Sequence, residues 1–352
     1  MSPKERMLTA IHLNEPDVVP VFEIEINEPI ARKILGRNTK DALDFYEVYS
    51  SLGLDGINFW DNKIPVKYLD QKSFVDEWGR VWTTQKDGIT YYVRGTVNTY
   101  EDLQDFIPPN PFDYNRLERL RKVIKNNRKE LAVVGGIHDA YEIPSQMRGV
   151  SNFLSDLHLN PNFAKRLIEI SVNYNIELAK AMIDLGVDII ISGDDYAYKS
   201  GPFMSPKHFR EFIAPYLKKI VDVVHKRGVP FIKHTDGYIW PILDEIVKTG
   251  IDALHPIEPK ANMSLKEVKE KYGERLCVMG NVDVTYILPF GTVEETIMEV
   301  KRCIDEAAYG GGYILTSSNS IHDAVKVENF KAMIEAAKAF GRYPIITKYI
   351  NK

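Results

Sequence analysis

Polar side chains that can transfer protons or bind metal ions follow a series of short apolar segments along this chain of 352 residues. The apolar segments resemble buried strands, so the polar residues fall where strands would end. In parallel α/β folds, catalytic groups stand at the carboxyl ends of the strands. The clustering therefore indicates an active site. The candidates are Glu23, Glu25, Trp60, Asp61, His138, Asp139, Asp194, Asp195, Tyr196, His234, Asp236, His255, Asn281, Asp283, Ser317, Ser318, Asn319 and His322.

The sharpest local signal is the segment His234-Thr235-Asp236-Gly237, which directly follows the apolar run ending at Lys233. Side chains two residues apart on an extended chain point to the same side. The imidazole and the carboxylate can therefore meet at one metal ion or ligand. The alternative is that His234 bonds a backbone carbonyl and Asp236 caps the next helix.

Adjacent carboxylates at Asp194 and Asp195 form the second signal. Neighbouring carboxylates raise one another's pKa, which suits proton transfer or cation binding. One of the two can instead be a solvated surface group, and the sequence does not decide which. Asp139 and Asp283 are equally well explained as helix caps. Cys277 lies within an apolar run and is interpreted as core.

The elements that must position these side chains are eight apolar runs with helical patterns between them. Continuous apolar strands separated by helices are typical of a buried parallel sheet. Ser2 with Glu5, Ser264 with Glu267, and Thr292 with Glu295 are typical helix starts. The pattern predicts one (β/α)8 TIM barrel spanning residues 1–352, with an N-terminal helix. The runs are 17–22, 55–60, 131–137, 187–192, 229–233, 251–254, 275–280 and 312–316.

One segment departs from this alternation. Residues 74–97 contain β-rich runs with turn signals at Trp78-Gly79-Arg80 and Lys86-Asp87-Gly88. We expect an antiparallel β-hairpin there, inserted after the second barrel strand.

The overall composition excludes several classes of protein. A net charge of −4 gives no reason to expect nucleic acid or an anionic membrane as partner. Two cysteines imply no disulfide framework. The N-terminus lacks the apolar run of a signal peptide, and no apolar stretch is long enough to cross a bilayer. We expect a cytoplasmic protein with a small-molecule substrate.

Several ordered segments carry a resemblance to a known family. They are Arg6–Ala10 with Asp17–Val21, Leu54–Asp61, Gly280–Asp283, and Gly311–Leu315 followed by Val327–Asn329. Together and in this order they resemble the uroporphyrinogen decarboxylase superfamily over nearly the whole chain. The resemblance implies two possible chemistries. One is metal-free decarboxylation of the acetate arms of a porphyrinogen, in which Asp61 would hold the pyrrole nitrogens. The other is methyl transfer from a methyl-corrinoid protein to a thiol, with zinc held by His-x-Cys and a later Cys.

The sequence departs from both patterns. The arginine-rich stretch of the decarboxylase is replaced by residues 22–27, with no arginine before Arg32. The active tyrosine of the decarboxylase aligns roughly with Ser145. The His-x-Cys of the methyltransferase becomes His234-x-Asp236, and both its second cysteine and the late histidine of the decarboxylase become Asn319. One histidine of the metal site is kept and no thiolate is.

The resulting hypothesis is a corrinoid-linked methyltransferase with an altered metal site. The expected metal ligands are His234, Asp236 and Glu23, or Asp194 in place of Glu23, around a divalent ion such as zinc. A partner protein would carry the corrinoid, and the resemblance also implies a homodimer. Two alternatives stay open: a uroporphyrinogen decarboxylase, and a binding protein without activity. The expected catalytic residues are Asp61, Asp194, His234 and Asn319; the expected substrate-binding residues are Glu23, Glu25, Trp60, His138, Asp195, Tyr196, His255, Asn281, Ser318 and His322.

Overall fold

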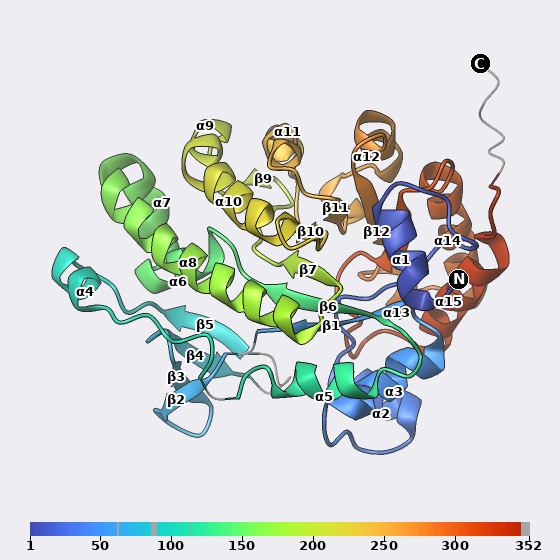
Figure 1. Cartoon of the computed structure of the whole chain (residues 1–352), viewed down its shortest axis with the longest axis horizontal. Helices are drawn as coiled ribbons and strands as arrows, with labels where there is room; N and C mark the ends of the chain where they lie inside the picture. The colour runs from blue at the N-terminus through green and yellow to red at the C-terminus, as the bar shows by residue number, and fades with distance from the viewer. Residues whose placement is uncertain (62, 86–89, 114, 346–352) are drawn as a thin grey trace.

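A curled parallel sheet forms the centre of the computed structural model, which describes residues 1–61, 63–85, 90–113 and 115–345 (Figure 1). Within these ranges the sheet has seven strands in the order β1-β6-β7-β10-β11-β12-β13, with every neighbouring pair parallel. Parallel strands need long crossovers, and helices provide them. The strands are β1 Gly56–Trp60, β6 Ala132–Ile137, β7 Ile189–Ser192, β10 Phe231–His234, β11 Ala253–His255, β12 Cys277–Val282 and β13 Tyr313–Ser317.

The predicted first strand, residues 17–22, does not form a regular strand. It makes single bridges, of which Val21 with Leu315 is parallel. The reason lies in its own chemistry: Pro20 has no N–H to donate, and the N–H of Val21 bonds the Asp55 carboxylate at 2.8 Å. Backbone bonds still connect the segment to both edges of the sheet, from Phe22 N to Leu315 O and from Asp55 N to Val21 O.

Helices cover the outer face of the sheet, and capping residues set where several of them begin. Ser2 and Thr292 form the expected capping boxes with Glu5 and Glu295, and Ser264 accepts a bond from Glu267 N. The helices are α1 Pro3–Ile11, α2 Glu28–Leu35, α3 Ala42–Leu52, α4 Tyr100–Asp105, α5 Glu118–Asn126, α6 Glu142–Arg148, α7 Val150–Leu159, α8 Pro161–Leu185, α9 Pro206–His208, the π-helical η1 Phe209–Ile213, α10 Ala214–His225, α11 Trp240–Lys248, the 3-10 helix η2 Pro259–Ala261, α12 Leu265–Tyr272, α13 Ile287–Phe290, α14 Val293–Ala307 and α15 Val327–Phe340.

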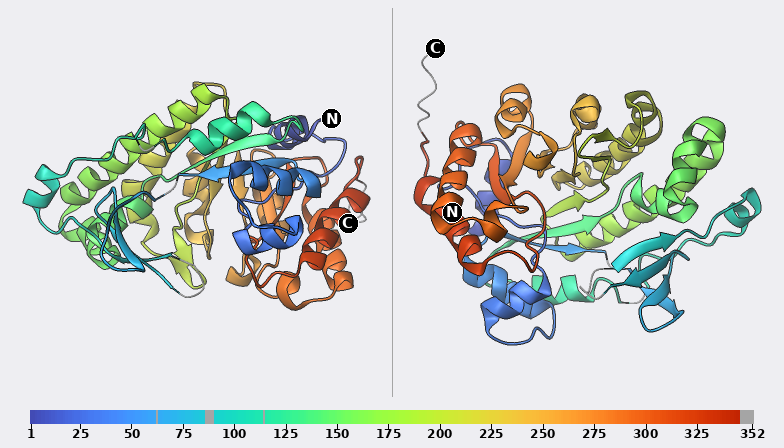
Figure 2. Two further views of the ribbon diagram at one scale, coloured as in Figure 1. Left: turned by 90° about the horizontal axis from the view of Figure 1, so that it is seen from below. Right: turned by 180° about the vertical axis from the view of Figure 1, so that it is seen from behind.

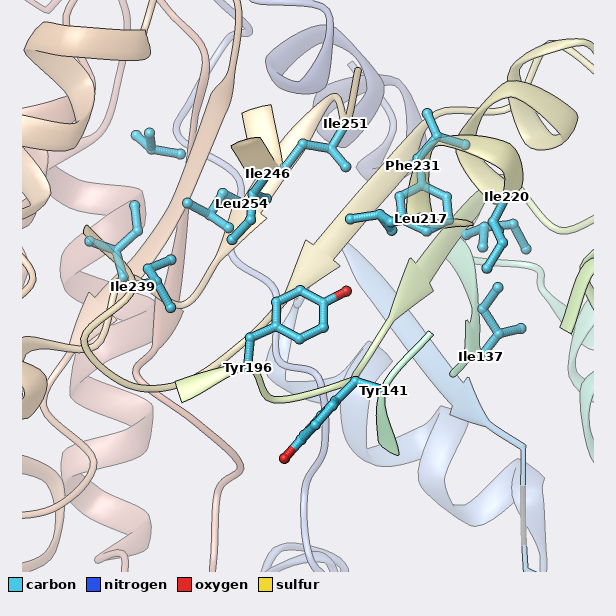
Figure 3. Packing of buried hydrophobic residues seen from close by; sticks show 14 of the residues in the cluster. Ile137, Tyr141, Tyr196, Leu217, Ile220, Phe231, Ile239, Ile246, Ile251 and Leu254 are labelled. Atoms are coloured by element: carbon cyan, nitrogen blue, oxygen red, sulfur yellow. The ribbon is translucent and has the colours of Figure 1, made fainter. Parts of the chain in front are cut away.

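Alternation along the strands divides the core into two parts, because successive strand side chains point to opposite faces. Ile232 and Cys277 belong to the inner cluster, which helix α1 completes with Met7 and Ile11. Phe231 belongs to the outer cluster between sheet and helices. Figure 3 shows its ring beside Leu217 of α10. Cys277 is fully buried among apolar side chains, as expected.

An antiparallel sheet is inserted after β1, larger than the predicted hairpin. Among the described residues it has four strands in the order β2-β3-β4-β5. It lies at the end of the molecule opposite α14 and α15 (Figure 2). The expected turn at Trp78-Gly79 is present, with Gly79 at a φ of 74°, whereas the turn expected at residues 86–88 lies outside the described residues. The strands are β2 Pro65–Tyr68, β3 Ser73–Asp76, β4 Val81–Thr84 and β5 Thr90–Arg94; a separate small ribbon pairs β8 Ala197–Tyr198 with β9 Gly201–Pro202.

Across the described ranges, no helix is both long enough and apolar enough to cross a membrane.

Candidate active site

A cavity of about 730 Å³ opens at the carboxyl ends of β1, β6, β7 and β10. A second hollow of about 900 Å³ adjoins it and shares Glu25, Lys63 and Asn319 with it. The expected residues that line the first cavity are Glu25, Trp60, Asp61, His138, Asp195, His234, Asp236 and Asn319; Ser318 and His322 line the second. Side chains far apart in the sequence therefore meet in one space.

His234 lies between two carboxylates at this cavity. Its Nε2 is 3.7 Å from Asp195 Oδ1 and 3.9 Å from Asp236 Oδ1. Its Nδ1 is 2.7 Å from Nδ1 of His255, which leaves Nε2 directed at the acids. Asp236 does not cap a helix, because α11 begins only at Trp240. The alternative that His234 bonds a backbone carbonyl also fails, since its partner is the His255 ring.

The electrostatics of this group suit a cation. Burial, and then the charge of Lys233, lowers the pKa of His234 to about 3, so the imidazole is neutral. Burial, and then Asp195 and Glu258, raises the pKa of Asp236 to about 9. Burial also raises the pKa of Asp195. A neutral imidazole offers a lone pair to a metal ion. Each carboxylate opposes ionisation of the other, and a positive ion between them would stabilise both in the ionised form.

The three side chains also fit a metal ion geometrically. One ligand atom from each of Asp195, His234 and Asp236 lies within 4.8 Å of the others. Asp236 Oδ1 is buried and has no hydrogen-bond partner among the described residues, an unusual state for a buried polar atom. Asn319 Nδ2 donates to the other oxygen, Oδ2. Mixed nitrogen and oxygen ligands accept zinc, manganese or iron.

His138 stands at the cavity edge with two acids of its own. Its Nδ1 is 3.0 Å from Asp194 Oδ1 and 3.4 Å from Glu142 Oε2. Asp194 is fully buried and its Oδ2 accepts the N–H groups of Tyr141 and Glu142 at 2.7 and 2.8 Å. Asp194 is therefore committed to holding His138 and the start of α6.

Asp61 is held by a buried ion pair. Arg116 donates to its Oδ1 and Tyr174 to its Oδ2, the latter at 2.9 Å. Arg116 also lies 3.4 Å from Glu77 of the inserted sheet. The pair thus connects the end of β1, helix α8 and the insertion, and both Asp61 oxygens are already engaged.

Trp60 lies against the backbone of two neighbouring strand ends. A Cβ added to Gly136 would collide with its ring, and one added to Gly193 would lie 2.7 Å from its Cη2. Glycine at both positions leaves the space that the indole needs. Trp60 therefore forms part of the cavity wall, with β6 and the end of β7 behind it.

Five expected site residues do not reach the cavity, and their predicted direct contact with a ligand is corrected. All are at most 1% exposed and contact other protein groups instead. Glu23 accepts bonds from Ser317 N and Oγ, so it is not part of the acid group around His234. Asp194 holds His138; Tyr196 donates to Asp139 at 2.6 Å; His255 holds His234; and Asn281 contacts Ile257 O and Arg302.

The remaining aspartates have structural partners. The Asp139 carboxylate accepts a hydrogen bond from the ammonium of fully buried Lys233 at 2.7 Å. This ion pair neutralises both charges beneath the cavity. Asp283 accepts N–H bonds from Thr285 and Tyr286 in the turn before α13, but it does not cap the helix, because α13 begins at Ile287 directly after Tyr286. Ser145 is buried on α6 and bonds Glu142 O.

Sequence reasoning missed four residues of this region: Lys63, Glu142, Arg116 and Arg119. Lys63 and Arg119 line the cavity. Glu142 could have been found from its position four residues after His138, where a helix start was to be expected. Arg116 and Arg119 stand in an ordinary polar stretch, and no spacing connects them with Asp61.

Comparison with known proteins identifies the family of this chain. The methylcobamide:CoM methyltransferase MtbA of Methanosarcina mazei is 26% identical over 254 residues, 70% of this chain and 71% of that protein. Uroporphyrinogen decarboxylase of Synechococcus sp. is 25% identical, covering 65% of this chain and 63% of that protein. A solved structure titled "methyltransferase from Methanosarcina mazei" superposes with a TM-score of 0.78 at 22% identity, covering 97% and 99% of the two chains. Because residues 80–340 match the sequence model of the family described as "Uroporphyrinogen decarboxylase (URO-D)", this chain belongs to that family.

Proposed function

We propose that this protein is a methyltransferase that moves a methyl group from a methylcobamide to a thiol, with a divalent metal held by His234, Asp195 and Asp236. The observation that carries the proposal is the His234 group, whose buried Asp236 Oδ1 has no partner among the described residues. Asp195 replaces Glu23 in the ligand set expected from the sequence. The resemblance to MtbA supports the reaction class.

Residues around the proposed metal site would each have a separate role. His255 fixes the orientation of the His234 ring, as an outer hydrogen bond does for metal-bound histidines. Asn319 holds Asp236, and Trp60 bounds the space in which a small substrate would lie. A bound divalent ion would lower the pKa of a thiol and favour the thiolate, which is the nucleophile.

The corrinoid would come from a partner protein, and the open cavity at the strand ends is where its methyl group would have to reach. We further propose that residues 17–22 complete the seven-stranded sheet as the eighth, irregular strand of a (β/α)8 barrel. We also propose that residues 1–352 fold as one domain. The bonds of Pro20–Phe22 to both sheet edges support the first point.

The test is methyl transfer from methylcobalamin to CoM and other small thiols, with protein depleted of metal and then reloaded with zinc, manganese or iron. We expect one metal ion per chain and metal-dependent demethylation of methylcobalamin. His234→Ala should abolish both, whereas His225→Ala, at an exposed pair with Asp252, should change neither. Full activity after exhaustive chelation would refute the metal site.

Porphyrinogen decarboxylation is the second candidate, supported by the relatives named uroporphyrinogen decarboxylase. The described wall of the first cavity carries Lys63 and Arg119 as cations against Glu25, Glu28, Asp195 and Asp236. Desolvating many substrate carboxylates beside these acids would be costly. A binding protein without catalysis would bind CoM or metal, but it would neither transfer a methyl group nor decarboxylate a porphyrinogen.

A further inference from the structure

The His138 ring is held in one protonation pattern by Asp194. Asp194 is fully buried, and its Oδ2 already accepts the N–H groups of Tyr141 and Glu142 at 2.7 and 2.8 Å, as an ionised carboxylate does. An ionised carboxylate can only accept hydrogen bonds. Nδ1 of His138 must therefore carry a hydrogen and donate it, at 3.0 Å. In the neutral ring, Nε2 is then left with a lone pair.

The segment that carries His138 is fixed from several sides. Its backbone N–H donates to the buried Asn175 at 3.0 Å. The next residue, Asp139, is bonded to Lys233 and Tyr196. Asp194 receives the N–H groups of Tyr141 and Glu142. A ring anchored in this way costs little entropy to place against a substrate.

The His138 side chain is open to the space where a ligand would bind. The His138 side chain keeps 20% of its surface exposed, and it lines the same cavity as Asp195 and His234. The described residues give Nε2 no hydrogen-bond partner. The proposed metal group and this base therefore open onto one space.

The charged groups around His138 favour its protonated form. Burial lowers the pKa of His138, but Glu142, from α6, and Asp194, from the end of β7, outweigh it and the net shift is upward; Lys63, from the loop after β1, opposes them. A proton accepted at Nε2 would be stabilised by two carboxylates near Nδ1. The ring is thus arranged to take up a proton.

We infer that His138 Nε2 accepts the proton of the acceptor thiol, with Asp194 as its positioning residue; this inference rests on the function proposed above. In this step the S–H bond breaks, its electron pair stays on sulfur and an N–H bond forms at Nε2. The thiolate then forms the S–CH3 bond as the bond from methyl to the methylcobamide breaks with its electron pair. After the methyl group has been transferred, the imidazolium returns its proton to solvent through the open cavity.

The experiment compares zinc-loaded wild type with His138→Gln, which keeps a polar side chain but cannot become a cation. The control is His158→Gln, at an exposed histidine of α7. Calorimetric titration with CoM at pH 8, in two buffers of different ionisation enthalpy, counts the protons released on binding. We expect His138→Gln to release up to one more proton per thiol than wild type. Its kcat/KM for methyl transfer from methylcobalamin should fall about 100-fold, the usual scale of a general base.

A pH profile separates a proton acceptor from a merely structural residue. The wild type should show an acid limb in kcat/KM, because His138 must be neutral to act, and His138→Gln should lack it. Glu142→Gln removes a negative charge near the ring, so the limb should move to lower pH by about one unit or less.

Each result decides a different point. Equal proton counts and an unchanged limb in His138→Gln would overturn the inference while leaving methyl transfer intact. If wild type binds CoM but transfers no methyl group, the proposed function fails and the proton count alone decides the inference. If CoM does not bind, both fail.

Discussion

Glu23 makes the stability of this protein depend on pH in a calculable way. The side chain is fully buried against Ser317, and burial raises its pKa from 4.5 to about 8, with the Ser317 bonds opposing the shift. Above pH 4.5 the unfolded chain loses the proton while the folded protein retains it until about pH 8. The folded state then binds more protons, so stability falls as pH rises through this window.

The size of the effect follows from the two pKa values. At about 1.4 kcal/mol per pKa unit, the gap corresponds to a loss of roughly 4 kcal/mol between pH 5 and pH 9. Glu23→Gln keeps the shape and never ionises: its amide oxygen can accept from Ser317 N–H and its NH2 can donate to Ser317 Oγ. The variant should therefore become more stable relative to wild type as pH rises.

Urea unfolding at pH 5, 7 and 9, followed by tryptophan fluorescence, measures this difference. Other titrating groups contribute equally to both proteins and cancel in the comparison. Glu335→Gln, at an exposed position of α15, is the control and should show no trend. A difference between wild type and Glu23→Gln that is the same at all three pH values would refute the argument that Glu23 is held neutral.

Three further outcomes are expected. Arg116→Met should destabilise the fold by about 3–5 kcal/mol, because it leaves Asp61 and Glu77 buried without their cation. The control Arg121→Met, at an exposed pair, should change the free energy of unfolding by less than about 0.5 kcal/mol. Equal effects of the two substitutions in urea unfolding would contradict this. Phe231→Ala should cost about 3–5 kcal/mol by leaving a cavity between β10 and α10, and an unfolding midpoint no lower than that of Phe112→Ala, at a 60% exposed ring, would count against it. An anaerobic assay should detect no conversion of uroporphyrinogen to coproporphyrinogen, and turnover at ordinary enzyme rates of about 1–1,000 per second would overturn the electrostatic reasoning.

Local patterns in the sequence were enough to locate the repeating elements. Seven of the eight predicted strands formed, because a continuous apolar run between helices has few other ways to bury its backbone and side chains. The remaining run, residues 17–22, did not form a regular strand, because the N–H of Val21 bonds the Asp55 carboxylate. Asp55 lies 34 residues away in the sequence, so the local pattern could not show this contact. The inserted sheet was underestimated because the four residues of β2 are exposed and form no continuous apolar run, which is the signal that located the buried strands.

The candidate site divides in the same way. The spacing of His234 and Asp236 predicted that both reach one cavity, since alternate residues of an extended chain share a face, and both line it although β10 ends at His234. Sequence could not decide between Asp194 and Asp195, because adjacent residues point in different directions and either could have faced inward. The fold decided it: the N–H groups that begin α6 and the His138 ring take Asp194, while Asp195 faces the cavity beside His234. Those partners come from a strand and helix more than fifty residues earlier, and only folding brings them together.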